Sequence, residues 1–271
     1  MKFKLESTRF PNSYYQKSGN GYPIVFIHGF GEDGRIWKNQ LVDLEKNYTC
    51  IIPDLPGSGQ SELPSNEISI DLMADFIYEI VVQEQIPKTI LLGHSMGGYI
   101  ALAFAEKNAQ LLDGFGLVHS SAYADDEIKK ENRRKSIKLI ENEGKEIFLK
   151  AMIPNLYSEI SKQTKIDQLA FHLTMALECS SLSLVAYYNA MINRPDRTSV
   201  LRQANIPILF VLGTEDTAVP IQHGLTQSAI PSYSQVEVLE QIGHTSMLEN
   251  PEKLNSILNS FCKCALEYKI A

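Results

Sequence analysis

Short runs of apolar residues recur along the chain, and stretches with helical spacing separate them. The runs are mostly continuous rather than alternating, which is typical of strands covered on both faces, as in a parallel sheet. They are 24–28 (IVFIH), 48–53 (YTCIIP), 88–93 (KTILLG), 114–119 (GFGLVH), 206–213 (IPILFVLG) and 234–240 (SQVEVLE). Ahead of them, the polar-apolar alternation in KFKLES and SYYQKS predicts an opening antiparallel hairpin.

Helices are predicted between these strands. In 69–86, apolar residues such as Ile70, Met73 and Ile77 recur at a spacing of three to four. The other predicted helices are 97–108, 220–229 and 251–262, the last starting at a proline, which is favoured at the first helical position. Alternation of strand and helix predicts an α/β fold, with a mostly parallel open sheet and helices on both faces.

Residues 121–196 interrupt this alternation. They separate two predicted strands by far more than a normal connection, and their composition is strongly helical. We therefore predict a helical cap at 121–196, inserted into an α/β core made of residues 1–120 and 197–271.

Composition excludes several classes of function. The formal net charge of −7 argues against nucleic acid, because phosphate binding needs concentrated lysine and arginine. The most basic stretch, KKENRRK at 129–135, is offset by neighbouring acidic residues and is interpreted as a solvated helix face. The apolar runs have strand length, so no membrane span is predicted, and no signal peptide is recognised.

The four cysteines are scattered through the chain. Cys262 and Cys264 are one residue apart on a predicted helix, so their side chains point to different faces. The sequence therefore predicts neither a disulfide framework nor a zinc site, and a reducing cytoplasm is the simplest location. We expect a monomer or a homodimer.

The stretch GHSMGG places a serine, Ser95, between a predicted strand and a predicted helix. Such a turn strains the backbone of its central residue, and small neighbours such as Gly93 and Gly97 make room for it. The strain exposes the hydroxyl at the carboxyl end of the sheet and at the positive end of the helix. The pattern predicts a nucleophile elbow with Ser95 as the nucleophile.

A serine nucleophile needs a base, and the base needs an orienting acid. In this kind of sheet the acid and then a histidine follow later strands. Asp216 lies in the turn after 206–213, and His244 lies in the loop after 234–240, so we predict them as acid and base. The other candidate acids are Glu215, Asp125 and Asp126.

Backbone N–H groups are predicted to stabilise the oxyanion. One belongs to Met96, the residue after the nucleophile. The other is assigned to Phe30, in the glycine-containing loop after the first parallel strand. His119, at the end of another strand beside the site, is a candidate to face the substrate.

Together these segments resemble the α/β-hydrolase fold superfamily, in its capped, esterase-like branch. The resemblance covers residues 20–262 and rests on HGFGEDGRIW, PDLPGSGQS, GHSMGG, GTEDTAVP and GHTSMLENPE. It implies a nucleophile at Ser95, an acid at Asp216, a base at His244 and oxyanion donors at Phe30 and Met96. Dehalogenases and epoxide hydrolases of this fold use an aspartate nucleophile, so Ser95 argues against both.

The expected function is hydrolysis of small apolar carboxylic esters through an acyl-enzyme, without a metal or an organic cofactor. The apolar residues Phe148, Met152, Met175, Leu177 and Met191 are candidates to roof the site. One alternative is hydrolysis of a C–C bond in a diketone-type acid, with Arg133, Arg134 or Arg194 as the cation for its carboxylate. A cofactor-free perhydrolase and a ligand-binding protein that keeps the triad are the others.

Overall fold

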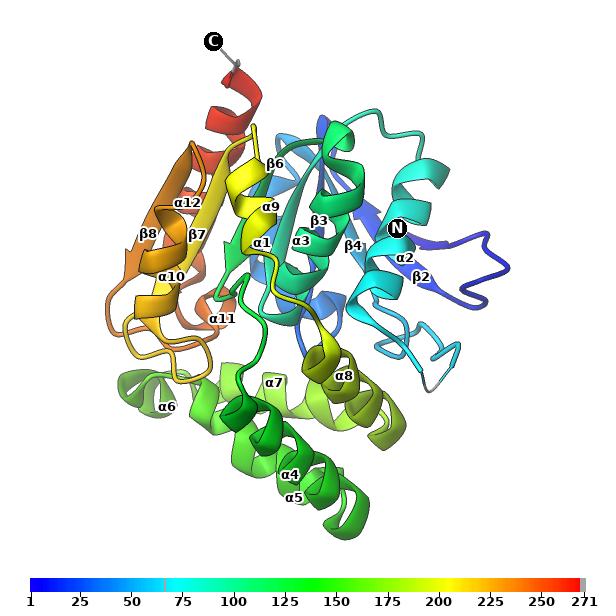
Figure 1. The fold of residues 1–271 in the computed structure, drawn as a ribbon, viewed down its shortest axis with the longest axis vertical. Coiled ribbons are helices and arrows are strands. Elements are labelled where there is room, and N and C mark those ends of the chain that lie inside the picture. Colours follow the sequence, from blue (N-terminus) through cyan, green and yellow to red (C-terminus); the bar gives the residue numbers. More distant parts are fainter. Residues whose placement is uncertain (66, 269–271) are drawn as a thin grey trace.

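In the computed structural model, which describes residues 1–65 and 67–268, eight strands form one sheet (Figure 1). Their order across the sheet is β1-β2-β4-β3-β5-β6-β7-β8. The strands are β1 (Lys2–Lys4), β2 (Tyr14–Ser18), β3 (Tyr22–Ile27), β4 (Tyr48–Pro53), β5 (Thr89–His94), β6 (Leu112–Val118), β7 (Ile208–Gly213) and β8 (Ser234–Leu239). Strands β3 to β8 are parallel, whereas β1 and β2 pair antiparallel, which confirms the predicted hairpin.

The continuous apolar runs correspond to buried strands, with one exception. Every residue of β5 and of β7 is buried, because helices cover both faces of the sheet there. Strand β8 lies at the edge, and Val236 and Val238 on it are exposed. The prediction that this run is covered on both faces was therefore wrong for β8.

Helices pack on both faces of the sheet (Figure 1). On one face α1 (Lys38–Leu44) packs against α12 (Pro251–Glu267). On the other, α2 (Ile70–Gln83) packs against α3 (Met96–Asn108), with α9 (Thr198–Gln203) beside α3 and α10 (Ile221–Ser228) against β7. The short α11 (Ser246–Glu249) precedes α12. This arrangement confirms the predicted α/β fold class.

The long connection between β6 and β7 contains a group of helices that lies below the sheet in Figure 1, at the carboxyl ends of the parallel strands. They are α4 (Glu127–Glu143), α5 (Lys145–Met152), α6 (Glu159–Thr164), α7 (Ile166–Glu178) and α8 (Ser181–Asn193). The insertion is helical, as the sequence predicts, while the boundaries at 121 and 196 stay a prediction.

Buried arginines connect the insertion to the core. Asp125, in the loop after β6, accepts a hydrogen bond from Nε of Arg133 on α4 at 2.6 Å. It also accepts one at 2.9 Å from Nη2 of Arg194, which directly follows α8. Arg197 binds Asp71 on α2 and Glu106 on α3. These ion pairs fix both ends of the insertion against the loop after β6 and the helices of the core.

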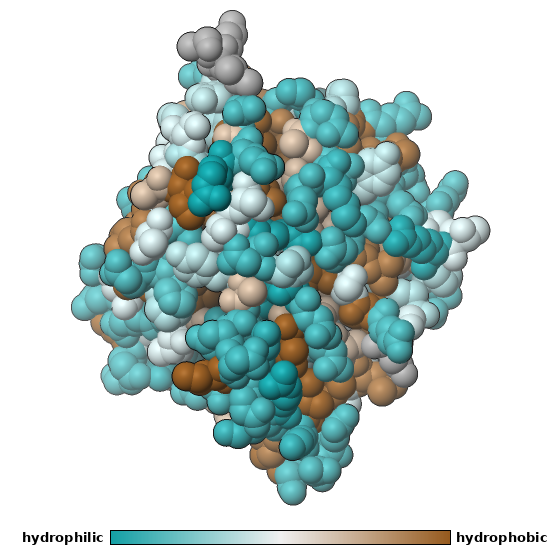
Figure 2. Space-filling view, in the orientation of Figure 1, coloured by the Kyte–Doolittle hydropathy of each residue, from teal (hydrophilic) through white to brown (hydrophobic). Residues whose placement is uncertain are grey.

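The surface in the view of Figure 2 is mainly hydrophilic, with hydrophobic residues in separate patches. In the part of the chain that the structure describes, no single helix is long and apolar enough to cross a membrane; α7 and α8, bent by 96°, pass that test only as a pair. The four cysteines, all within that part, are free thiols.

Glycines allow the backbones of β3, β5 and α3 to approach one another. A Cβ atom added at Gly97 would lie 2.2 Å from the carbonyl oxygen of Ile27, and one at Gly93 would lie 2.3 Å from that of Gly97. Backbone atoms cannot rotate away as a flexible side chain can. A methyl group at either position therefore requires β3, β5 or α3 to move.

We expect Gly97→Ala to lower the free energy of unfolding by about 1–3 kcal/mol or more, because the added methyl overpacks the junction. Gly114→Ala is the matched control, since its Cβ would come no closer than 3.2 Å to its neighbours. Urea unfolding of both variants measures the difference. A Gly97→Ala variant as stable as the wild type would contradict this account of the junction.

Candidate active site

Ser95 stands between β5 and α3 with no loop on either side. Its φ of 51° and ψ of −114° are uncommon for a residue with a side chain, which indicates a strained turn. Its N–H donates to the carbonyl of Val118 at 3.0 Å, and its carbonyl accepts from the Ser120 hydroxyl at 2.7 Å. The end of β6 thus holds the backbone of Ser95 from both sides, and the side chain is half-buried.

The predicted acid and base are in contact. Asp216 lies in the turn after β7, and its Oδ2 accepts a hydrogen bond from His244 Nδ1 at 2.8 Å. Its Oδ1 accepts from the N–H groups of Ala218 and Val219, both at 2.9 Å. Burial alone would raise the pKa of Asp216, but the contacts with His244 and His119 hold that pKa well below its usual range. The group is therefore an anion that fixes the proton of His244 on Nδ1.

The loop that carries His244 is held by a second buried carboxylate. Glu249 accepts hydrogen bonds from the N–H groups of Gly243 and Thr245, both at 3.1 Å, and from that of Ser158 at 2.9 Å. The N–H of His244 itself donates to the carbonyl of Leu156. Since Leu156 and Ser158 belong to the insertion, the base loop is fixed jointly by the core and the insertion.

Ser95 and His244 line the same cavity, whose volume is about 420 Å³. The hydrogen bonds of the described residues do not include one between the Ser95 hydroxyl and His244. Such bonds are often long without substrate and shorten in the reacting complex. Ser95, the predicted nucleophile, and the hydrogen-bonded imidazole of His244 therefore face the same cavity.

Phe30 and Met96 are positioned near Ser95, Phe30 on the cavity wall and Met96 as the first residue of α3. Neither N–H donates to another group in the part of the chain that the structure describes, so both are free to bind an oxyanion. The Phe30 ring stacks on Tyr188 with centroids 4.2 Å apart, which ties this loop to α8. Their assignment as oxyanion donors stays a prediction.

A carboxylate and an imidazole that sequence reasoning missed lie beneath these loops. Glu32 Oε2 accepts from the N–H of Gly29 at 2.7 Å and from His94 Nδ1 at 2.9 Å. His94 Nε2 lies 2.9 Å from the carbonyl oxygen of His244. Both partners of His94 only accept, so both of its nitrogens donate and the ring is an imidazolium.

The electrostatics of this pair agree with its hydrogen bonds. Burial opposes charge on His94, but Glu32 outweighs burial and raises the pKa of His94. His94 in turn outweighs the burial of Glu32 and lowers the pKa of that carboxyl to about 2. This pair thereby connects three segments of the site: the loop of Phe30, which Glu32 binds at Gly29, the elbow, where His94 directly precedes Ser95, and the loop of His244.

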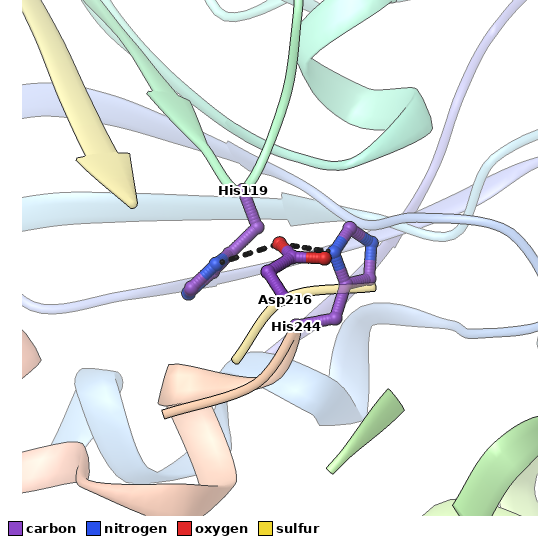
Figure 3. A group of neighbouring side chains, drawn as sticks. All are labelled: His119, Asp216 and His244. Atoms are coloured by element: carbon purple, nitrogen blue, oxygen red, sulfur yellow. Dashed lines mark hydrogen bonds and ion pairs between the residues drawn. The ribbon is translucent and has the colours of Figure 1, made fainter. Parts of the chain in front are cut away.

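The structure places His119 differently from the prediction that it faces the substrate. Its side chain is completely buried and does not line the cavity. Its Nδ1 lies 3.2 Å from Asp216 Oδ2 (Figure 3). Its Nε2 lies 2.8 Å from the Ser246 hydroxyl. The reason for the difference is that the chain turns inward after β6, which directs the ring at the acid.

The other candidate acids have different contacts. Asp125 pairs with two arginines, Asp126 accepts the N–H of Lys129 at the start of α4, and Glu215 accepts the N–H of Glu159. Within the described residues, none of the three contacts His244. Of the candidate cations, Arg133 lines the cavity, Arg194 stacks on Tyr99, and Arg134 is exposed.

His119, Asp216 and His244 are also the group that could hold a metal ion, since one ligand atom of each lies within 4.8 Å of the others (Figure 3). Two imidazoles and a carboxylate suit several divalent metals. The same atoms form the two hydrogen bonds to Asp216, so this geometry is accounted for without an ion.

Comparison with known proteins agrees with the fold. A family model described as the alpha/beta hydrolase fold matches residues 22–137. A solved thermophilic esterase from Thermogutta terrifontis is 28% identical, covers 98% of this chain and 99% of its own, and superposes with a TM-score of 0.92. The chain has the α/β-hydrolase fold.

Two curated relatives of this hydrolase cover nearly its whole length. The AB hydrolase superfamily protein YisY of Bacillus subtilis is 25% identical, over 92% of this chain and 94% of its own. The putative carbamate hydrolase RutD of Yersinia enterocolitica is also 25% identical, over 92% of this chain and 91% of its own. The shared fold and these relatives identify the chain as a hydrolase and leave the bond that it cleaves open.

His172, on α7, is a buried imidazole of this hydrolase whose charge affects stability. Burial lowers its pKa to about 4, although Glu32 Oε1 lies only 3.5 Å from its Nε2. The unfolded chain binds this proton near pH 6.5, so between pH 6.5 and 4 the unfolded state holds a proton that the folded state lacks. Stability is therefore lost as the pH falls through this window.

We expect His172→Gln to reduce that loss, by up to roughly 1.4 kcal/mol per pH unit within the window. Urea unfolding at intervals between pH 7 and pH 4 gives the slope. The same substitution at the exposed His223 is the control for removing a histidine. An unchanged slope in His172→Gln would show that the buried ring is not the source.

Proposed function

We propose that this protein is a serine hydrolase that cleaves carboxylic esters of small apolar substrates through an acyl-enzyme on Ser95. The observation that carries the proposal is the 2.8 Å hydrogen bond from His244 to Asp216, with His244 and Ser95 on the wall of one cavity. The strained turn that presents Ser95 supports the same role.

The reaction begins with proton transfer. His244 Nε2 takes the proton of Ser95 while Oγ attacks the ester carbonyl, and Asp216 stabilises the resulting imidazolium. The tetrahedral intermediate places its oxyanion at the N–H groups of Phe30 and Met96. His244 then gives the proton to the departing alcohol, and the acyl group remains on Ser95.

Water completes the cycle by the same steps. His244 removes a proton from the water that attacks the acyl-enzyme, and the acid leaves as Ser95 regains its proton. The anionic state of Asp216 is needed throughout, and its four N–H contacts maintain it. The chemistry proposed for these residues uses no cofactor.

The cavity wall favours a small apolar acyl or alcohol group. Met152 and Met191, two of the predicted roof residues, line it together with Phe30, Leu156 and Tyr188. Flexible methionines accommodate varied apolar groups in a limited volume. Of the other predicted roof residues, Phe148 and Met175 are buried and Leu177 is half-buried, and all three lie outside the cavity lining. The similarity to the Thermogutta esterase supports an ester substrate.

A substrate with a carboxylate is a second candidate, since Arg133 and Lys129 also line the cavity. Arg133 shares Asp125 with Arg194, so one carboxylate faces two guanidinium groups. The Thermogutta esterase was solved with malate bound, a dicarboxylic acid. This observation favours an acid-bearing ester, or the C–C bond of a diketone-type acid, as the alternative.

Ser95→Ala is expected to lower turnover of p-nitrophenyl butyrate by about six orders of magnitude, and Asp216→Asn by about four, because each removes part of one catalytic unit. Steady-state rates with both variants check this. Asp125→Asn is the control for the choice of acid. If Asp216→Asn kept near wild-type activity and Asp125→Asn lost it, the acid would be misassigned.

Soluble esters with acyl chains of about two to six carbons are expected to give the highest kcat/KM, because the roofed cavity limits length. The measurement compares p-nitrophenyl esters from acetate to palmitate, above and below the solubility limit. Comparing a mono-succinyl ester with the butyrate ester tests whether the enzyme prefers a substrate with a carboxylate. Arg133→Met then shows whether Arg133 is responsible for such a preference. A preference for palmitate, or activation at an emulsion, would rule out the small-substrate proposal.

A further inference from the structure

The turn after β6 is the second strained point near Ser95. His119 has a φ of 50°, a left-handed conformation that a residue with a side chain adopts at a cost. Its neighbours on both sides, Val118 and Ser120, form the two hydrogen bonds to the backbone of Ser95. The turn therefore connects directly to the nucleophile, and the side chain at its centre points away to the acid.

Both nitrogens of the buried His119 ring have partners. A carboxylate oxygen only accepts, so Nδ1 carries a proton and donates it to Asp216 Oδ2. Burial lowers the pKa of His119, so the ring is neutral, and the Ser246 hydroxyl donates to Nε2. Figure 3 shows the result: two imidazoles, His119 and His244, on either side of one carboxylate.

We propose that His119 is a positioning residue for Asp216, and through Asp216 for the base His244. This inference rests on the proposed function. Asp216 Oδ1 is held by two backbone N–H groups, and its Oδ2 is held by two imidazole N–H groups. With all four contacts made, the carboxylate cannot rotate away from His244 Nδ1.

The imidazole of His119 also reduces the negative charge that Asp216 presents to His244. A hydrogen bond from His119 takes up part of the charge on Oδ2, the oxygen that His244 uses. Without it, Oδ2 would carry more negative charge and would stabilise the protonated form of His244 more strongly. Since His244 must be neutral to accept the Ser95 proton, activity would then begin at higher pH.

A substitution at His119 replaces none of the other charged or titratable groups near this pair. They come from the elbow, the loop after β3, the insertion and α11, and they are His94, Glu32, His172, Lys129 and Glu249. A shift seen in a His119 variant can therefore be assigned to the lost N–H donor.

Two substitutions separate the N–H donor from the strained backbone. His119→Gly suits the positive φ and removes the side chain. His119→Asn also tolerates a positive φ and keeps an N–H donor where Nδ1 stands. We expect His119→Gly to lower kcat by about 10- to 100-fold with little change in KM. We also expect the acid limb of its kcat/KM profile to move up by roughly half a pH unit. His119→Asn should return both toward the wild type.

The rate at which a fluorophosphonate labels Ser95, measured against pH, gives the same readout without assuming a substrate. No labelling of the wild-type protein would contradict the proposed function itself. With labelling intact, a wild-type rate and acid limb in His119→Gly would overturn the role of His119. So would a His119→Asn variant that folds, by its melting temperature, yet is as impaired as His119→Gly. Should His119→Gly fail to fold, His119→Ala, which also lacks the donor, takes its place: an acid limb displaced upward relative to His119→Asn supports the role, and equal acid limbs overturn it.

Discussion

At Ser95 the chain passes from β5 into α3 without a loop, and this is possible only because three backbone segments come into close contact. Gly93 and Gly97 have no room for a Cβ atom against α3 and β3, and Ser95 takes a positive φ. The cost of such a turn is of the order of 1–3 kcal/mol and persists only where the surroundings enforce it. Packing against the buried strands β3, β5 and β6 keeps Ser95 in this strained conformation, and this conformation fixes the position of its hydroxyl.

Each loop of the site is then tied to this turn by a buried polar contact. The pair Glu32–His94 links the loop of Phe30 to the elbow and, through the carbonyl of His244, to the base. The end of β6 binds the backbone of Ser95 and, with His119, the acid. Removing one partner of such a buried pair leaves an uncompensated polar group, which is more destabilising than the pair is stabilising. The site is thus held together by a few buried residues outside the predicted triad.

Much of this could be predicted from the sequence, because the strongest signals are local. Continuous apolar runs predicted the strands of the sheet, and the glycines around Ser95 predicted the tight turn between strand and helix. The strand-end positions of Asp216 and His244 led to a pair that is in fact hydrogen-bonded. What failed depends on long-range geometry: β8 lies at the edge of the sheet rather than between covered strands, and His119 points at Asp216 rather than into the cavity. Glu32 and His94 are 62 positions apart, and only the folded sheet shows that they form a pair.

The central claim is that Ser95 carries the acyl group during turnover, and direct detection of that bond tests it. The protein is quenched in acid during steady turnover of p-nitrophenyl butyrate, digested, and its peptides are weighed by mass spectrometry. We expect a butyryl group on the peptide that contains Ser95, and none on the same peptide of Ser95→Ala. Turnover at an undiminished rate with the acyl group on another residue, or with Ser95 replaced, would contradict it.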